Sequence, residues 1–116
     1  MNVRILARWI DDPTESPITL DAELDADRRI RGEWTIFGAT DIDTDLAKPF
    51  ALDRGGRMDF GAGRAEADRV WRADVRTKAI EVGARFSVTW SGGERGEYRI
   101  EKVSVPGGKV RELGVA

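Results

Sequence analysis

Cysteine and histidine are both absent from the 116 residues. Without them the chain cannot form disulfides, zinc sites with thiolate or imidazole ligands, or nucleophile pairs of the Ser-His and Cys-His type. The 21 Asp and Glu residues offer many carboxylate pairs for acid-base chemistry, but no spacing singles out one of them. The sequence therefore predicts that the protein is not an enzyme, and it indicates no cofactor.

Long apolar runs are absent as well. No stretch approaches the roughly 18 consecutive apolar residues that a membrane helix needs, and the charged residue Arg4 follows closely after Met1. A chain of 116 residues is long enough for one modest hydrophobic core. We expect a single soluble domain, residues 1–116, made in a reducing cytoplasm and without a membrane partner.

The net charge of -2 conceals an asymmetry between the two halves of the chain. Residues 1–53 contain 12 Asp and Glu against 6 Lys and Arg, whereas residues 54–116 contain 9 against 13. In a homo-oligomer this segregation would let an acidic face of one subunit meet a basic face of the next, although both can equally be solvated surfaces. The mixed composition lacks the strong basic excess of a dedicated nucleic-acid-binding protein.

The C-terminal third has the clearest periodicity. Apolar and polar side chains alternate over residues 86–90 and again over residues 98–101, which is typical of strands with one buried face. Residues 91–97 between them supply three glycines for a chain reversal. A second reversal at Pro106-Gly107-Gly108-Lys109 leads to a last strand through residues 110–115. The pattern predicts a three-stranded antiparallel meander.

Three further strands are expected in the N-terminal half. Residues 2–10 are rich in strand formers, and the prolines at positions 13 and 17 end that run. Residues 18–24 form the second strand, and residues 29–37 form the third because Ile30, Trp34 and Ile36 alternate with polar residues. Together with the meander, these strands predict an all-β fold, a small antiparallel β-barrel or sandwich.

Residues 38–68 show little periodicity and contain five glycines, so we expect one long protruding loop. Short strands at residues 49–52 and 57–60 are the alternative. Three arginines stand among the glycines of this segment, and arginine binds phosphate in a bidentate manner. Arg54, Arg57 and Arg64 are therefore candidate DNA contacts, the alternative being a solvated loop without a partner.

The acidic run Asp41-Ile42-Asp43-Thr44-Asp45 has the spacing that opens an EF-hand calcium loop. Leu46 stands where that loop requires glycine, and Leu52 stands where it requires a bidentate glutamate. The sequence therefore predicts no metal site.

Four tryptophans and one charged cluster remain. Each tryptophan falls in an expected strand, which favours core or subunit interface over an aromatic platform for sugar or single-stranded nucleic acid; the four are Trp9, Trp34, Trp71 and Trp90. The expected strand at residues 69–76 carries charges of both signs on its exposed face. These residues are candidates for ion pairs across a subunit interface: Arg69, Arg72, Asp74 and Arg76.

The order of elements over residues 69–115 resembles the C-terminal half of phage head-closure proteins. The features that carry the resemblance are a strand at residues 69–76, Gly83 before an alternating strand, a glycine-rich tip, the run Tyr98-Arg99-Ile100-Glu101-Lys102-Val103, and a glycine turn before a final strand. Head-closure proteins are the head-to-tail joining or stopper proteins of long-tailed phages, with counterparts in gene transfer agents.

This resemblance implies a homo-oligomeric ring below the portal or its adaptor protein, assembled in the host cytoplasm and located in the virion neck. Such a ring closes the DNA channel after packaging and attaches a tail-terminator or tail tube protein. The long loop, residues 41–64 by its place in the layout, would make transient, non-specific contact with packaged double-stranded DNA. The alternatives are a tail-terminator or minor tail protein, and a free β-barrel that binds sugar, peptide or single-stranded nucleic acid.

Overall fold

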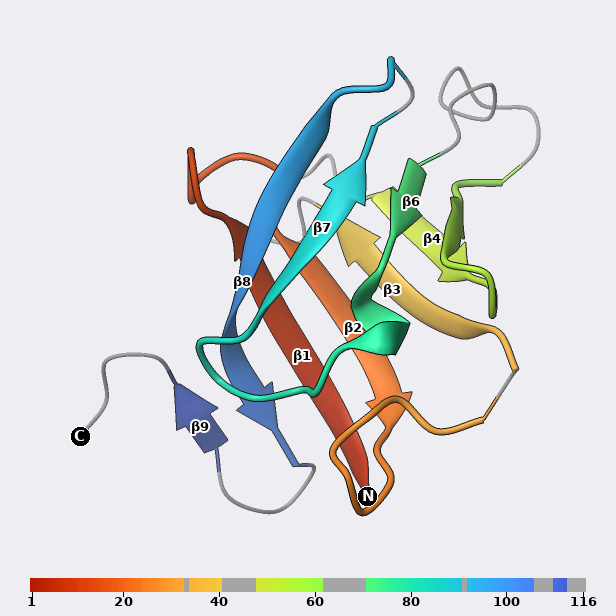
Figure 1. The fold of residues 1–116 in the computed structure, drawn as a ribbon, viewed down its shortest axis with the longest axis vertical. Helices are drawn as coiled ribbons and strands as arrows, with labels where there is room; N and C mark the ends of the chain where they lie inside the picture. Colours follow the sequence, from red (N-terminus) through yellow and green to blue (C-terminus); the bar gives the residue numbers. More distant parts are fainter. Residues whose placement is uncertain (33, 41–47, 62–70, 91, 106–109, 113–116) are drawn as a thin grey trace.

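The computed structural model describes residues 1–32, 34–40, 48–61, 71–90, 92–105 and 110–112, the last of these by their backbone. The chain forms a closed, eight-stranded antiparallel β-barrel in which each strand pairs with the next and β1 pairs with β8 (Figure 1). The strands are β1 (Asn2–Trp9), β2 (Ile18–Glu23), β3 (Ile36–Thr40), β4 (Lys48–Leu52), β5 (Arg57–Asp59), β6 (Trp71–Ala73), β7 (Arg85–Thr89), β8 (Arg95–Ser104) and β9 (Val110–Glu112). The predicted all-β barrel is confirmed.

The hydrophobic core fills the barrel, because alternate side chains of each strand point inward. On β1 these are Val3, Ile5 and Ala7, each at most 3% exposed. Tyr98 of β8 is fully buried and stacks on Phe86 of β7 with ring centroids 5.7 Å apart. Its hydroxyl donates a hydrogen bond of 2.9 Å to the carbonyl oxygen of Ser16, which keeps a polar atom satisfied inside the core.

The long strand β8 closes the barrel and also carries β9. Its first half pairs with β7, its second half pairs with β1, and residues 102–104 pair with β9. The predicted meander β7-β8-β9 is thereby confirmed as far as Glu112, and residues 113–115 of its expected last strand lie outside the described residues. The strands expected at residues 2–10 and 18–24 are confirmed as well. Since β9 lies beyond the eight-strand closure, the barrel wall consists of β1 to β8 (Figure 1).

The prediction of one long protruding loop over residues 38–68 is wrong for residues 38–40 and 48–60, while residues 41–47 and 62–68 lie outside the described part of the chain. β4 and β5 lie within this range and pair with their neighbours in the barrel wall. Phe50, Leu52, Met58 and Phe60 are at most 5% exposed, so the segment contributes to the core. The alternative of short strands at 49–52 and 57–60 is correct. Pro49 interrupts the pattern of β4, and β5 has only three residues between glycine-containing turns, so no alternation stands out in this segment.

The predicted strand at residues 29–37 is wrong for its first seven residues, since β3 begins only at Ile36. An Asp25 carboxylate oxygen accepts hydrogen bonds from the backbone N–H groups of Asp27 and Arg29, at 2.8 and 3.0 Å, and so builds a turn. Gly32 then adopts a φ of +85°, which interrupts any strand. The alternation at Ile30 and Trp34 therefore comes from a connecting segment.

Candidate functional site

The outer face of β5 to β8 presents arginines opposite one another. The strand register aligns Arg57 with Arg72, Arg72 with Thr89, and Thr89 with Arg95. Closer to the other end of the barrel, Arg85 of β7 faces Arg99 of β8. Like charges directly opposite each other on neighbouring strands destabilise a sheet. We call these five exposed residues, Arg57, Arg72, Arg85, Arg95 and Arg99, the arginine face.

Most of the arginine face has no acidic partner in the part of the chain that the structure describes. Within the described residues, the side chains of Arg57, Arg72, Arg85 and Arg99 take part in no hydrogen bond or ion pair. Arg95 is the exception, because its Nη2 donates to Ser87 Oγ at 2.7 Å and its Nε lies 3.7 Å from Glu97 Oε1. The surface therefore carries positive charge that the fold does not neutralise.

Two of the three predicted DNA-contact arginines lie in or beside the arginine face. Arg54 is exposed in the turn between β4 and β5, and Arg57 begins β5, whereas Arg64 lies outside the described residues. The turn is tight, since Asp53 Oδ1 accepts hydrogen bonds of 2.9 Å from the backbone N–H groups of both Gly55 and Arg57.

The same turn is docked onto β6. The backbone N–H of Ala73 donates to the carbonyl oxygen of Gly56 at 2.8 Å. Gly56 has a φ of +88°, and a Cβ added there would lie 2.4 Å from the Ala73 carbonyl oxygen. Only glycine fits this approach, so the turn holds Arg54 and Arg57 against the barrel wall.

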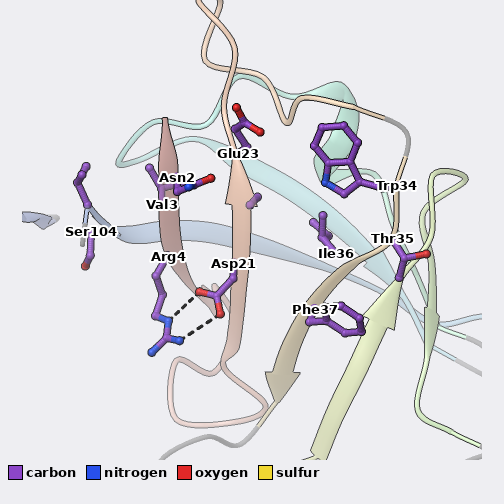
Figure 2. A pocket seen from close by; sticks show the side chains of 12 residues that line it. Asn2, Val3, Arg4, Asp21, Glu23, Trp34, Thr35, Ile36, Phe37 and Ser104 are labelled. Atoms are coloured by element: carbon purple, nitrogen blue, oxygen red, sulfur yellow. Dashed lines mark hydrogen bonds and ion pairs between the residues drawn. The ribbon is translucent and has the colours of Figure 1, made fainter. Parts of the chain in front are cut away.

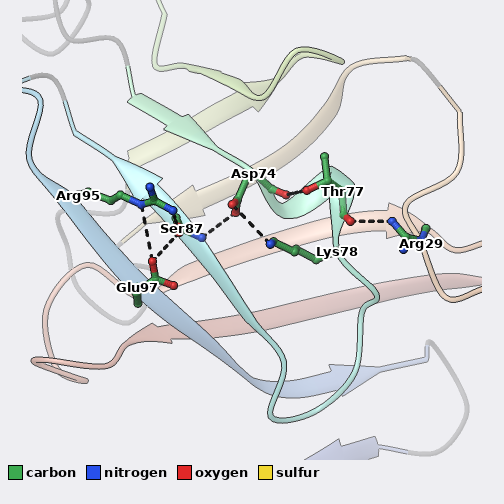
Figure 3. A network of polar contacts seen from close by, with 7 residues as sticks. All are labelled: Arg29, Asp74, Thr77, Lys78, Ser87, Arg95 and Glu97. Carbon is green, nitrogen blue, oxygen red and sulfur yellow. Dashed lines mark hydrogen bonds and ion pairs between the residues drawn. The ribbon is translucent and has the colours of Figure 1, made fainter.

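The predicted interface residues that the structure describes do not share one strand face. β6 ends at Ala73, and the chain turns into a 3-10 helix, Val75–Thr77, with Asp74 as its N-cap. Arg72 is exposed on β6, and Arg69 lies outside the described residues. An Asp74 carboxylate oxygen accepts a 2.7 Å hydrogen bond from the backbone N–H of Ser87, and the other lies 3.8 Å from Lys78 Nζ (Figure 3). Asp74 therefore joins the 3-10 helix to β7 within one chain.

Arg76 is also engaged inside its own chain. Its Nε donates to the carbonyl oxygen of Asp53 at 2.8 Å, and its Nη2 donates to those of Trp34 and Leu52 at 2.7 and 3.1 Å. Burial lowers the pKa of Arg76, and the nearby Asp53 carboxylate opposes this shift in part. The guanidinium group thus clamps the segment before β3 and the end of β4 to the 3-10 helix. The strand expected over residues 69–76 is wrong beyond Ala73.

A groove lies across the ends of β1, β2, β3 and β8 (Figure 2). It has a volume of about 860 Å³. Trp34 and Phe37 line it and are 54% and 67% exposed. Beside them, Arg4 donates to both carboxylate oxygens of Asp21, at 2.8 and 3.1 Å, and this contact raises the pKa of Arg4. We call this site, with Glu23 on its rim, the aromatic groove.

Sequence reasoning missed the aromatic groove. Trp34 was expected in a strand, and Phe37 was not singled out at all. A signal was present, because Phe37 directly follows the inward residue Ile36 and must point to the outer face of β3. An aromatic residue at an outward position is the pattern that could have revealed this surface.

The other three tryptophans pack against the core. Trp9, Trp90, Trp71 and Phe60 form a chain of edge-to-face contacts, with successive ring centroids 5.2, 6.3 and 5.0 Å apart. They lie at the barrel end where β1 and β7 finish and β6 begins. For these three tryptophans the core interpretation is confirmed, and only Trp34 is left exposed.

In the part of the chain that the structure describes, no three acidic side chains gather into a metal-binding group. The acidic run at residues 41–45 lies outside that part. None of the described helices has the length and apolar character to cross a membrane. No protein family model, no curated protein and no solved structure matches this chain.

Proposed function

We propose that this protein is a structural subunit of a virion neck, a head-closure or stopper component. It assembles into a homo-oligomeric ring below the portal or its adaptor, closes the DNA channel after packaging and offers an attachment surface to the tail. The resemblance of residues 69–115 to phage head-closure proteins supports the place of the protein in the particle. The aromatic groove is the observation that supports assembly into a ring.

Exposure of two large aromatic side chains in one groove favours a protein contact. Soluble monomers seldom leave such apolar surface uncovered, and tryptophan is among the residues that contribute most to binding at interfaces. Trp34 and Phe37 keep more than half of their surface in solvent. The exposed ion pair of Arg4 and Asp21 beside them is typical of the polar rim of an interface.

The partner best suited to the groove is a second copy of this chain. In the closed order of eight strands, β2 and β3 stand opposite β6 and β7, and Figure 1 shows β7 in front of β1 and β2. Trp34 and Phe37 of the groove therefore lie on the β3 flank of the barrel and Arg85 lies on the β7 flank, while Arg99 lies on β8, between β7 and β1. Guanidinium groups stack on aromatic rings, so Arg85 and Arg99 of one copy suit Trp34 and Phe37 of the next.

Contacts between two different flanks are heterologous. Such contacts join subunits head to tail, and they generate a ring when the rotation between neighbours closes. Segregation of acidic residues into the first half of the sequence and basic residues into the second fits the same arrangement. A tail-terminator would use the same geometry with a different neighbour in the particle.

Light scattering after size-exclusion chromatography tests this function. We expect the protein to form a discrete oligomer, either alone at high concentration or when a portal–adaptor assembly from the same source is added. Trp34→Ala combined with Phe37→Ala should remove the oligomer, while the exposed control Glu15→Ala should keep it. A monomer that ignores the portal–adaptor assembly at every concentration would contradict the proposal and favour a free binding module.

A further inference from the structure

A second pocket, of about 330 Å³, opens beside the arginine face. The turn between β4 and β5, β6, the 3-10 helix, β7 and β8 all contribute to it. Four arginines and one aspartate line this pocket: Arg54, Arg72, Arg76, Arg95 and Asp74. Its volume corresponds to about ten water molecules at ~30 Å³ each, so a hydrated anion fits. We call it the arginine pocket.

The acidic groups at the pocket are already engaged. Asp74 binds the Ser87 backbone N–H and lies near Lys78, and Glu97 accepts a hydrogen bond of 2.5 Å from Ser87 Oγ and lies near Arg95 (Figure 3). Each carboxylate thus has one positively charged neighbour, Lys78 for Asp74 and Arg95 for Glu97. These contacts leave Arg72 without a counterion among the described residues, whereas Arg76 has the Asp53 carboxylate nearby.

Arg76 and Arg72 differ in how they present their charge. Arg76 donates to three neutral carbonyl oxygens, which fix its position and leave its charge intact; its buried Nη1 has no hydrogen-bond partner within the described residues. Arg72 is exposed and makes no side-chain contact of this kind with the described part of the chain. One guanidinium is thus held in place, and the other is free to close on a ligand.

We infer that the arginine pocket binds a phosphate group of a nucleic-acid backbone. Guanidinium groups bind phosphate oxygens in pairs, and the Thr89 hydroxyl at the pocket adds a further donor. The row from Arg57 through Arg72 and Thr89 to Arg95 crosses four strands, about 14 Å at strand spacing. This row is longer than one phosphate, so a chain of phosphates engages it better than free phosphate does.

This inference rests on the proposed function for the source of the phosphate, which there is packaged double-stranded DNA. It moves the DNA contact from an extended loop to the barrel wall. The pocket is separate from the expected subunit contact, since Thr89 lies four residues along β7 from Arg85, about 13 Å. Assembly and phosphate binding can therefore be disturbed one at a time.

Fluorescence anisotropy with a labelled 30-base-pair duplex provides the test, with Arg72→Gln as the pocket variant and Arg31→Gln as the control. Both substitutions remove one exposed arginine, and Arg31 lines neither the arginine pocket nor the aromatic groove. We expect Arg72→Gln to weaken binding about tenfold at low salt and to reduce the slope of log K against log salt by about 0.9. Arg31→Gln should weaken binding less than about twofold. Equal losses in the two variants, or no duplex binding by the wild type, would overturn the inference.

A titration with inorganic phosphate tests whether the pocket binds free phosphate or the phosphates of a nucleic-acid backbone. In nuclear magnetic resonance titrations, we expect millimolar phosphate to shift the amide signals of Ser87 and Thr89 and to leave those near Trp34 unchanged. Duplex DNA should shift the same signals at lower concentration. If phosphate shifts them and DNA does not, the site takes free phosphate and the nucleic-acid inference is wrong. If Arg72→Gln changes self-association and not DNA binding, the pocket binds an acidic group of a neighbouring subunit and the inference is wrong. The proposed function is tested separately by the loss of assembly in the variant with Trp34→Ala and Phe37→Ala.

Discussion

The two flanks of the barrel handle charge in opposite ways. On β1 and β2, Arg4 pairs with Asp21, and in the segment after β2 Arg31 pairs with Glu23, so arginines and carboxylates meet within the flank. On β7 and β8, Arg85 faces Arg99 with no acidic partner among the described residues. The first flank is locally balanced and offers exposed aromatic surface, whereas Arg85 and Arg99 on the second have no counter-charge among the described residues. This difference indicates two binding surfaces of different chemistry on one barrel.

The two flanks belong to one closed barrel only if β4 and β5 are part of its wall. Leu52 of β4 is 1% exposed, so Leu52→Ala should lower the free energy of unfolding by about 2–5 kcal/mol. Phe37→Ala removes a larger side chain from the adjacent strand, yet it should change stability by less than about 0.5 kcal/mol because Phe37 is exposed. Urea unfolding measures both. Similar losses in the two variants would contradict the placement of β4 in the barrel wall.

Within the basic flank, Arg76 and Arg72 should respond differently to the same substitution. Arg76→Met removes three hydrogen bonds to backbone carbonyl oxygens, two of them part-buried, and should cost about 2 kcal/mol of stability. Arg72→Met should be neutral within about 0.5 kcal/mol, since its side chain is exposed. Thermal unfolding followed by circular dichroism compares them. If Arg72→Met proves as costly as Arg76→Met, Arg72 has a structural role and is not held for a partner.

The smallest expected effects are two changes in stability of opposite sign, one on each flank. Arg85→Glu replaces a like-charge pair with Arg99 by an opposite-charge pair, so it should raise stability by about 0.2–1 kcal/mol. Arg4→Gln breaks an exposed ion pair with Asp21 and should lower stability by about 0.5 kcal/mol. Denaturant titration at low and high salt follows both, and both effects should shrink as salt screens the charges. Two changes of the same sign would remove the electrostatic contrast between the flanks.

The sequence predicted β7 and β8 from their alternation, and β1 and β2 from runs of strand formers bounded by proline and acidic turns. β4 and β5 were visible only as candidates, because Pro49 interrupts the pattern of β4 and β5 has only three residues. A pattern of apolar residues also says little about where the chain leaves a sheet, which is why the strand at residues 29–37 was placed too early.

The site residues likewise divide into those that the sequence could place and those that it could not. Outward arginines on predicted strands, such as Arg72 and Arg99, could be placed from the strand period alone. Asp74 and Arg76 could not, because their roles depend on backbone groups of Ser87, Asp53 and Trp34 that are remote in sequence. The arginine pocket likewise depends on which strands become neighbours when the barrel closes.

A mixing experiment tests the head-to-tail contact between the two flanks most directly. One variant carries Trp34→Ala with Phe37→Ala, and the other carries Arg85→Ala with Arg99→Ala, so each retains one intact flank. We predict that each variant alone is monomeric by native mass spectrometry, and that an equimolar mixture forms a one-to-one dimer that grows no further. A mixture that stays monomeric while the wild type assembles, or a variant that assembles alone, would contradict the account.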